Sequence, residues 1–208
     1  MTLSSPENMD LLSDACMLKK SWALMAQRQS SNSEITRYVF KIVLLGDPAV
    51  GKTSLVKRYV DNMFSQDYLM TIGTNILAKT VHIDDNRIKL NIWDLGGQPL
   101  FKEVRETYCN GANGAILVFD LTRQNTLNNL HGWVQTLWRL VGKIPLVFVG
   151  NKADLKNIRE ISMEQILDFA HFSDAKYFET SAKTGEGVDN TFVYLTRVNL
   201  AKNTYGSH

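Results

Sequence analysis

The stretch GDPAVGKT, residues 46–53, constrains the fold of this chain more than any other feature. Its spacing is GxxxxGK[ST], that of a loop which wraps phosphate. The loop follows YVFKIVLLG, an apolar run suited to a buried strand, and opens KTSLVKRYV, where Leu55, Val56 and Tyr59 have helical spacing. Because strand, loop and helix occur in this order, we predict a phosphate-binding loop at the amino end of a helix.

The rest of the chain alternates short apolar strands with helical stretches. ILAKTVHI and IKLNIW flank DDNR and predict a hairpin, and GAILVFDLT, IPLVFVGNK and KYFETSA are further strands. Helical spacing covers residues 125–141, 162–169 and 188–201, and Ser162 with Gln165 resembles a capping box. We therefore predict an α/β domain with a mostly parallel six-stranded sheet, one antiparallel strand, and helices on both faces.

The residues of the phosphate-binding loop have separable roles. Glycine at both ends of the loop lets the backbone turn tightly, so that successive amides converge on an anion. Lys52 is expected to reach the β and γ phosphates, and the hydroxyl of Thr53 to bind Mg²⁺. The residues expected at the phosphates are Gly46, Asp47, Pro48, Ala49, Val50, Gly51, Lys52, Thr53 and Ser54. The loop alone does not distinguish ATP from GTP.

The stretch NKAD, which follows an apolar strand and ends at Asp154, discriminates between purines. The Asp154 carboxylate can accept hydrogen bonds from the ring imino and exocyclic amino groups of guanine, which adenine lacks. Because unpaired buried polar groups penalise the wrong base, such a site rejects ATP by about 10⁴ or more. Lys152 is expected to lie along the base and ribose, and Asn151 to tie this loop to its neighbours. In TSAK, residues 180–183, the amide of Ala182 is expected to donate to the guanine carbonyl oxygen.

The stretch WDLGGQ, residues 93–98, supplies what hydrolysis at a γ phosphate needs. Asp94 ends a predicted strand, where its carboxylate can hold the metal through water. Gly97 lets a backbone amide approach the γ phosphate without a side chain in the way. The amide side chain of Gln98 both donates and accepts, so it can orient an attacking water.

Together these motifs resemble those of the Ras superfamily of small GTPases, over roughly residues 38–201. The resemblance implies that Thr71 coordinates Mg²⁺ and acts in catalysis with Lys52 and Gln98. It implies that Phe64 packs on the guanine base and that Tyr68 lies near the phosphates. It also places Ser181, Ala182 and Lys183 at the base. TIGT and NTLNNLHGW resemble Rab proteins, whereas WDLGGQ resembles Arf proteins, and we favour the Rab-like interpretation.

The resemblance implies a molecular switch that binds GTP or GDP with Mg²⁺ and responds to effector, exchange-factor and GTPase-activating proteins. Neither the phosphate-binding loop nor residues 61–74 contain an arginine, so we expect slow intrinsic hydrolysis and stimulation by a partner. An alternative is a constitutively nucleotide-bound interaction module with little or no hydrolysis. An ATP-dependent small-molecule kinase would need an acceptor site, which the sequence does not offer.

Three residues depart from the usual family pattern. Pro48 fixes φ near −65° and so stiffens the phosphate-binding loop without a long side chain. Ala49 is expected to be acceptable only if its φ is negative. Pro99 restricts the backbone of Gln98, which is either pre-positioned for water or kept from it. We expect phosphate binding to survive these changes, while their effect on hydrolysis stays open.

The remaining composition narrows the setting of the domain. The net charge is +2, and the sequence contains no long basic block, so no nucleic-acid polymer is expected as a partner. Two distant cysteines and the lack of a long apolar run predict a cytoplasmic protein, and we expect it to be a monomer. We divide the chain into an extension, 1–36, a GTPase domain, 37–201, and a tail, 202–208. Residues 9–28 have the spacing of an amphipathic helix, and peripheral membrane contact or packing on the domain both stay open.

Overall fold

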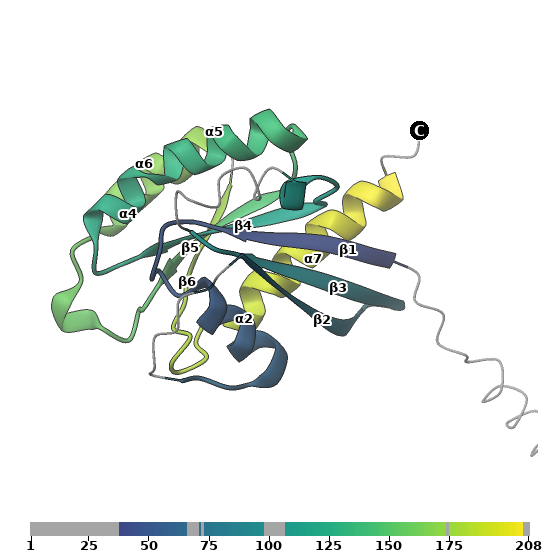
Figure 1. Cartoon of the computed structure of the whole chain (residues 1–208), viewed down its shortest axis with the longest axis horizontal. Helices are drawn as coiled ribbons and strands as arrows, with labels where there is room; N and C mark the ends of the chain where they lie inside the picture. Colours follow the sequence, from purple (N-terminus) through teal and green to yellow (C-terminus); the bar gives the residue numbers. More distant parts are fainter. Residues whose placement is uncertain (1–37, 66–70, 72, 98–106, 174, 206–208) are drawn as a thin grey trace, which may run out of the picture. The chain divides into compact units, whose positions relative to one another are not determined.

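The computed structural model describes residues 38–65, 71, 73–97, 107–173 and 175–205. These residues form a six-stranded sheet in the order β2-β3-β1-β4-β5-β6, with helices on both faces (Figure 1). The pair of β2 and β3 is antiparallel, and the other neighbouring pairs are parallel. The strands are β1 Tyr38–Leu45, β2 Thr74–Ile83, β3 Asn86–Leu95, β4 Gly114–Asp120, β5 Leu146–Asn151 and β6 Lys176–Glu179. The predicted fold class is confirmed.

Alternation of side chains along β1 builds a core on each face of the sheet. Phe40, Ile42 and Leu44 belong to one buried cluster, which includes residues of α2 and α7, whereas Val43 and Leu45 belong to the other, which includes residues of α4, α5 and α6. The described helices are α2 Lys52–Asp61, α4 Gln124–Asn128, α5 Leu130–Val141, the 3₁₀ helix η2 Lys156–Ile158, α6 Met163–Ser173 and α7 Val188–Tyr205. β4 and β5 are buried along their whole length, as expected of central parallel strands.

The predicted hairpin is confirmed, although DDNR lacks the commonest turn pair. Ile83 pairs with Asn86, so Asp84 and Asp85 alone form the turn between β2 and β3. Asp84 has a φ of 53°. Tight hairpin turns require this left-handed conformation, and aspartate tolerates it better than most residues do.

The helices differ from expectation at their ends. The helix expected over 125–141 is two helices, α4 and α5, which are separated at Asn129 although that residue keeps near-helical angles (φ −74°, ψ −14°). α6 continues beyond the expected end at residue 169, and α7 continues to Tyr205, into the expected tail. The sequence carries no proline or glycine at the break after α4 or at the end of α6, which is why the pattern placed these two only approximately, whereas α7 ends directly before Gly206.

The capping box before α6 is confirmed. The Ser162 amide donates to Gln165 Oε1 at 2.9 Å, and the Gln165 amide donates to Ser162 Oγ at 3.3 Å. The extension 1–36, with its predicted amphipathic helix, lies outside the described residues. None of the helices in the described ranges is both long enough and apolar enough to cross a membrane.

Candidate nucleotide-binding site

A cavity of about 420 Å³ lies where β1, β3 and β5 end. This volume is in the range of small-molecule sites, and the carboxyl edge of a parallel sheet is where such folds bind ligands. Most of the predicted site residues line it. The lining residues that the sequence predicted are Pro48, Ala49, Gly51, Lys52, Thr53, Ser54, Phe64, Thr71, Gly97, Asn151, Lys152, Asp154, Ala182 and Lys183.

The phosphate-binding loop depends on two glycines with positive φ. Gly46 has a φ of 136° and Gly51 one of 97°. A Cβ on Gly46 would lie 2.1 Å from the carbonyl oxygen of Val118, so only glycine fits there. Ala49 has a φ of 62°, and our condition that its φ be negative is therefore wrong. The fold imposes the left-handed conformation on a residue with a Cβ, which costs roughly 1–2 kcal/mol.

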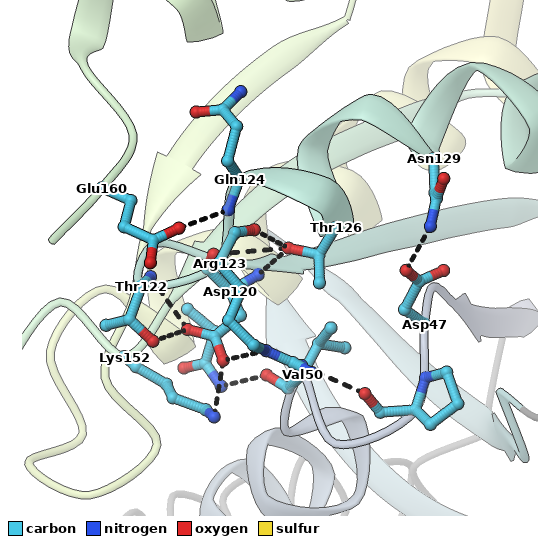
Figure 2. A network of polar contacts seen from close by, with 12 residues as sticks. Asp47, Val50, Asp120, Thr122, Arg123, Gln124, Thr126, Asn129, Lys152 and Glu160 are labelled. Atoms are coloured by element: carbon cyan, nitrogen blue, oxygen red, sulfur yellow. Dashed lines mark hydrogen bonds and ion pairs between the residues drawn. The ribbon is translucent and has the colours of Figure 1, made fainter.

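Lys52 is placed across the phosphate-binding loop. Its side chain is buried, and Nζ donates to the carbonyl oxygens of Gly46 and Asp47 at 2.8 Å each. The carboxylate of Asp47 faces α5, where it accepts a hydrogen bond from Asn129 Nδ2 at 2.7 Å (Figure 2) and another from Trp133 Nε1 at 2.8 Å. Asp47 can therefore serve a ligand only through its backbone.

Three oxygen-bearing side chains meet at one corner of the site. Thr53 Oγ1 donates to Asp94 Oδ2 at 2.5 Å and lies 2.7 Å from Thr71 Oγ1. Asp94 is fully buried, and its Oδ1 has no hydrogen-bond partner among the described residues. Burial raises the pKa of Asp94, against the opposing effects of the Thr53 hydrogen bond and nearby lysines. A buried oxygen without a partner beside two hydroxyls fits a hard cation such as Mg²⁺.

At Gly97, the backbone that follows β3 lies directly against the phosphate-binding loop. A Cβ on Gly97 would lie 2.6 Å from the Gly46 carbonyl oxygen and 2.7 Å from the Pro48 nitrogen. Only glycine permits this approach. Gln98, Pro99 and Tyr68 lie outside the described residues, so their predicted roles stay predictions.

Asn151 ties three loops together, as predicted. Its Nδ2 donates to the Val50 carbonyl oxygen at 2.9 Å, and its Oδ1 accepts from Thr180 Oγ1 and the Ala182 amide, each at 3.2 Å. The Ala182 amide, which we expected to donate to guanine, thus already has an acceptor within the protein. It would have to share its hydrogen with a base or move to it.

The carboxylate of Asp154 is held in place by hydrogen bonds. Its Oδ1 accepts from Ser181 Oγ at 2.6 Å, and Ser181 Oγ in turn accepts from the Thr184 amide at 3.1 Å. Asp154 is partly exposed to the cavity that it lines, whereas Ser181 is buried behind it. A carboxylate held in this way presents acceptors at a constant position.

Sequence analysis missed several residues that support the site. Arg58 of α2 donates through Nε to the Ala182 carbonyl oxygen at 2.8 Å and through Nη2 to that of Lys183 at 2.7 Å. Asp120 is fully buried at the end of β4 and pairs with Lys152 Nζ at 2.6 Å. An aspartate that closes an apolar strand was the available signal for Asp120. The unpredicted residues that line the cavity are Lys57, Met63, Ser65, Leu95, Gly96 and Leu155.

Comparison with known proteins assigns the family. The sequence profile described as the Ras family matches residues 41–201. The chain is 39% identical over 161 residues to the Ras-related protein Rab-21 of Homo sapiens, and the matched region covers 77% of this chain and 72% of the relative. It is 40% identical over 156 residues to the Ras-related protein RABA1f of Arabidopsis thaliana, covering 74% of this chain and 72% of the relative. It is also 36% identical over 166 residues to the Ras-related protein Rab-13 of Canis lupus familiaris, covering 79% and 82%. The chain therefore belongs to the Ras family of small GTPases and is Rab-like.

Proposed function

We propose that this chain is a guanine-nucleotide switch that binds GTP or GDP with Mg²⁺ and hydrolyses GTP slowly unless a partner stimulates it. One observation carries the proposal. A single cavity joins a fixed carboxylate, Asp154, at one end to a buried lysine, Lys52, at the other. This is the arrangement expected for a purine with a polyphosphate tail.

The base end accounts for the choice of guanine. Ser181 occupies Oδ1 of Asp154, so the acceptor capacity that remains on the carboxylate is available to the two N–H groups of guanine. Adenine presents no N–H donor at the same two positions, so the carboxylate would be covered by the base without gaining partners. Phe64 and Lys152 also line the cavity and supply apolar surface for the base.

The phosphate end accounts for affinity. Lys52 Nζ donates to two carbonyl oxygens. In a phosphate-bound form, its ammonium group would be shared between these carbonyl oxygens and the phosphate oxygens. The Thr53 and Thr71 hydroxyls, with Asp94 behind them, would hold Mg²⁺, which when bound neutralises phosphate charge. The lysine and the amides of the phosphate-binding loop orient the tail, and Gly97 lets the adjoining backbone come close to its end.

For hydrolysis we propose Gln98 as the residue that orients water. Residues 61–74 contain no arginine, so charge developing on the leaving phosphate needs a group from a GTPase-activating partner. Family membership favours this switch over the constitutively bound module. We further propose that effector and exchange-factor proteins read the nucleotide state, as expected of a Rab-like protein.

Identification of the bound nucleotide tests the first part. The full chain is purified gently with Mg²⁺, its nucleotide is released by acid and separated by chromatography, and fluorescent GDP and ADP are then titrated. We expect guanine nucleotide only, and Asp154→Ala to weaken GDP binding by about 10³-fold or more. Asp168→Ala, which removes an exposed carboxylate on α6, is the matched control. Equal competition by ATP would overturn the assignment of Asp154.

Timed phosphate release from bound GTP tests the second part. We expect slow single-turnover hydrolysis that drops by about 10-fold or more in Gln98→Ala, because water loses its orienting amide. A chain that binds GTP without releasing phosphate, or releases it equally well after Gln98→Ala, would favour the constitutive module.

A further inference from the structure

A buried carboxylate outside the cavity connects the two ends of the site. Asp120 ends β4 with its side chain wholly inaccessible to solvent. Its Oδ2 accepts from Lys152 Nζ at 2.6 Å and from Arg123 Nε at 2.9 Å, and its Oδ1 accepts from the amide and hydroxyl of Thr122 at 3.0 and 2.7 Å (Figure 2). Two cations from different loops therefore share one oxygen.

The guanidinium of Arg123 makes a second contact with the phosphate-binding loop. Nη2 donates to the Pro48 carbonyl oxygen at 3.1 Å, across 75 residues of sequence (Figure 2). The rigid fork of a guanidinium lets Nε and Nη2 serve two acceptors at once. A continuous path of contacts thus runs from Pro48 through Arg123 and Asp120 to Lys152.

The same segment after β4 contacts the phosphate-binding loop at a second point. Asn129 and Trp133 both donate to the Asp47 carboxylate, next to Pro48. The loop is therefore anchored on its outer side by Arg123, Asn129 and Trp133. On its inner side Asn151 holds the Val50 carbonyl.

Backbone conformation at both ends of this path needs support from contacts. Lys152 has a φ of 69° and Ala49, next to Pro48, has a φ of 62°. Left-handed conformations cost non-glycine residues free energy and persist only when the surroundings enforce them. The hydrogen bonds to Pro48 and the ion pair of Lys152 are placed to enforce them.

We propose that Arg123 is a positioning residue that couples the phosphate-binding loop to the guanine-binding loop through Asp120, and so slows release of nucleotide. The inference rests on the proposed function. Arg123 itself need not touch the nucleotide. Removing it frees the Pro48 carbonyl and leaves Lys152 as the one remaining cation on Asp120, so both loops gain freedom at once.

The test measures the rate at which fluorescent GDP leaves the Mg²⁺-loaded full chain when unlabelled GDP is added in excess. We expect Arg123→Ala to release GDP about five- to tenfold faster, the size expected for losing one ordinary hydrogen bond, since Arg123 is partly exposed. Arg123→Lys keeps the charge beside Asp120, but its single ammonium cannot copy the two fixed directions of the fork. We therefore expect Arg123→Lys to have the melting temperature of the wild type, while its GDP release stays about threefold or more faster than that of the wild type.

The control variant Arg139→Ala makes the result decisive. Arg139→Ala removes an exposed arginine of α5 and should leave release unchanged, which excludes an effect of net charge. Release within twofold of wild type in Arg123→Ala would overturn the proposal. So would complete recovery by Arg123→Lys, because charge alone would then suffice, or equal acceleration by Arg139→Ala. A wild-type chain that binds no fluorescent GDP would instead refute the proposed function itself.

Discussion

Asp94 and Asp120 both lie near the carboxyl end of a strand that neighbours β1, and they have opposite surroundings. β3 and β4 both pair with β1, and each aspartate lies at the carboxyl end of its strand with no exposed surface. Both oxygens of Asp120 are hydrogen-bonded, and one of them also pairs with two cations. Within the described part of the chain, Asp94 accepts a hydrogen bond from Thr53 on Oδ2 and has no partner on Oδ1.

The pKa shifts of the two carboxyls follow these surroundings. Burial raises the pKa of Asp94 because its charged form is poorly compensated. Burial would also raise the pKa of Asp120, but hydrogen bonds from Lys152 and Thr122 outweigh it, and the net pKa is lowered. The Asp120 carboxylate is compensated by Lys152 and Arg123 of the protein itself, whereas the surroundings of Asp94 fit the Mg²⁺ site proposed above. One belongs to the scaffold of the site and the other to its ligand chemistry.

The largest expected effect is on Asp120. Asp120→Asn keeps the shape of the side chain but leaves Lys152 and Arg123 without their shared anion. We expect the free energy of unfolding to fall by about 3 kcal/mol, since Asp120 is wholly buried and charge-assisted hydrogen bonds to two cations, each about a third exposed, are lost together. Urea denaturation of the GDP-loaded chain measures it. Unchanged stability would mean that solvent compensates both cations. Asp120 would then not be a stabilising part of the scaffold, in contrast to what we infer.

Asp94→Asn should act in the opposite direction in protein freed of nucleotide and metal. A neutral amide removes the uncompensated buried charge, so we expect the free energy of unfolding to rise by about 1–2 kcal/mol. In the GDP-loaded chain the same change should abolish most of the stabilisation by Mg²⁺, because the cation loses its carboxylate. Melting temperatures with Mg²⁺ and with a chelator measure both effects. If the metal-free variant were destabilised, the Asp94 corner would be self-sufficient.

The dependence of stability on acid should also differ in sign. The lowered pKa of Asp120 contributes stability above about pH 4, which is lost as the pH falls toward the folded-state pKa. The raised pKa of Asp94 has the reverse effect, since its unfavourable charge disappears as the pH falls through the raised pKa toward about 4. Between pH 7 and 3, metal-free Asp120→Asn should therefore lose less stability than wild type, and Asp94→Asn more. Parallel curves for the three proteins would contradict both assignments.

This contrast also explains what sequence could and could not predict. Lys52 and Asp154 belong to short motifs that follow apolar strands, so local spacing placed them correctly in the cavity. The contact of Arg123 with Pro48 spans 75 residues and leaves no local pattern. The break between α4 and α5 at Asn129 also leaves no signal in the sequence, because the backbone there stays close to helical. Long-range polar contacts depend on the packed fold, which a periodic pattern does not encode.

The smallest effect concerns Ala49, which lies on the loop between the two corners. Its φ of 62° strains a residue with a Cβ by roughly 1–2 kcal/mol, and glycine would relieve that strain. Glycine also gives the unfolded chain more freedom, which offsets about 0.4–1 kcal/mol. We therefore expect Ala49→Gly to raise the free energy of unfolding by about 0.5–1 kcal/mol, measured by urea denaturation of the GDP-loaded chain.

A matched change elsewhere separates this relief of strain from a general effect of glycine. Ala201→Gly, at an exposed position within α7, should lower stability by about 1 kcal/mol, because no positive φ is relieved there. Opposite signs for the two alanines would mean that the outer anchors, through Pro48 and Asp47, impose the conformation of Ala49 against its own preference. Destabilisation by both would place the origin of the loop geometry in Ala49 itself, and the Asp120 corner would then support the loop without shaping it.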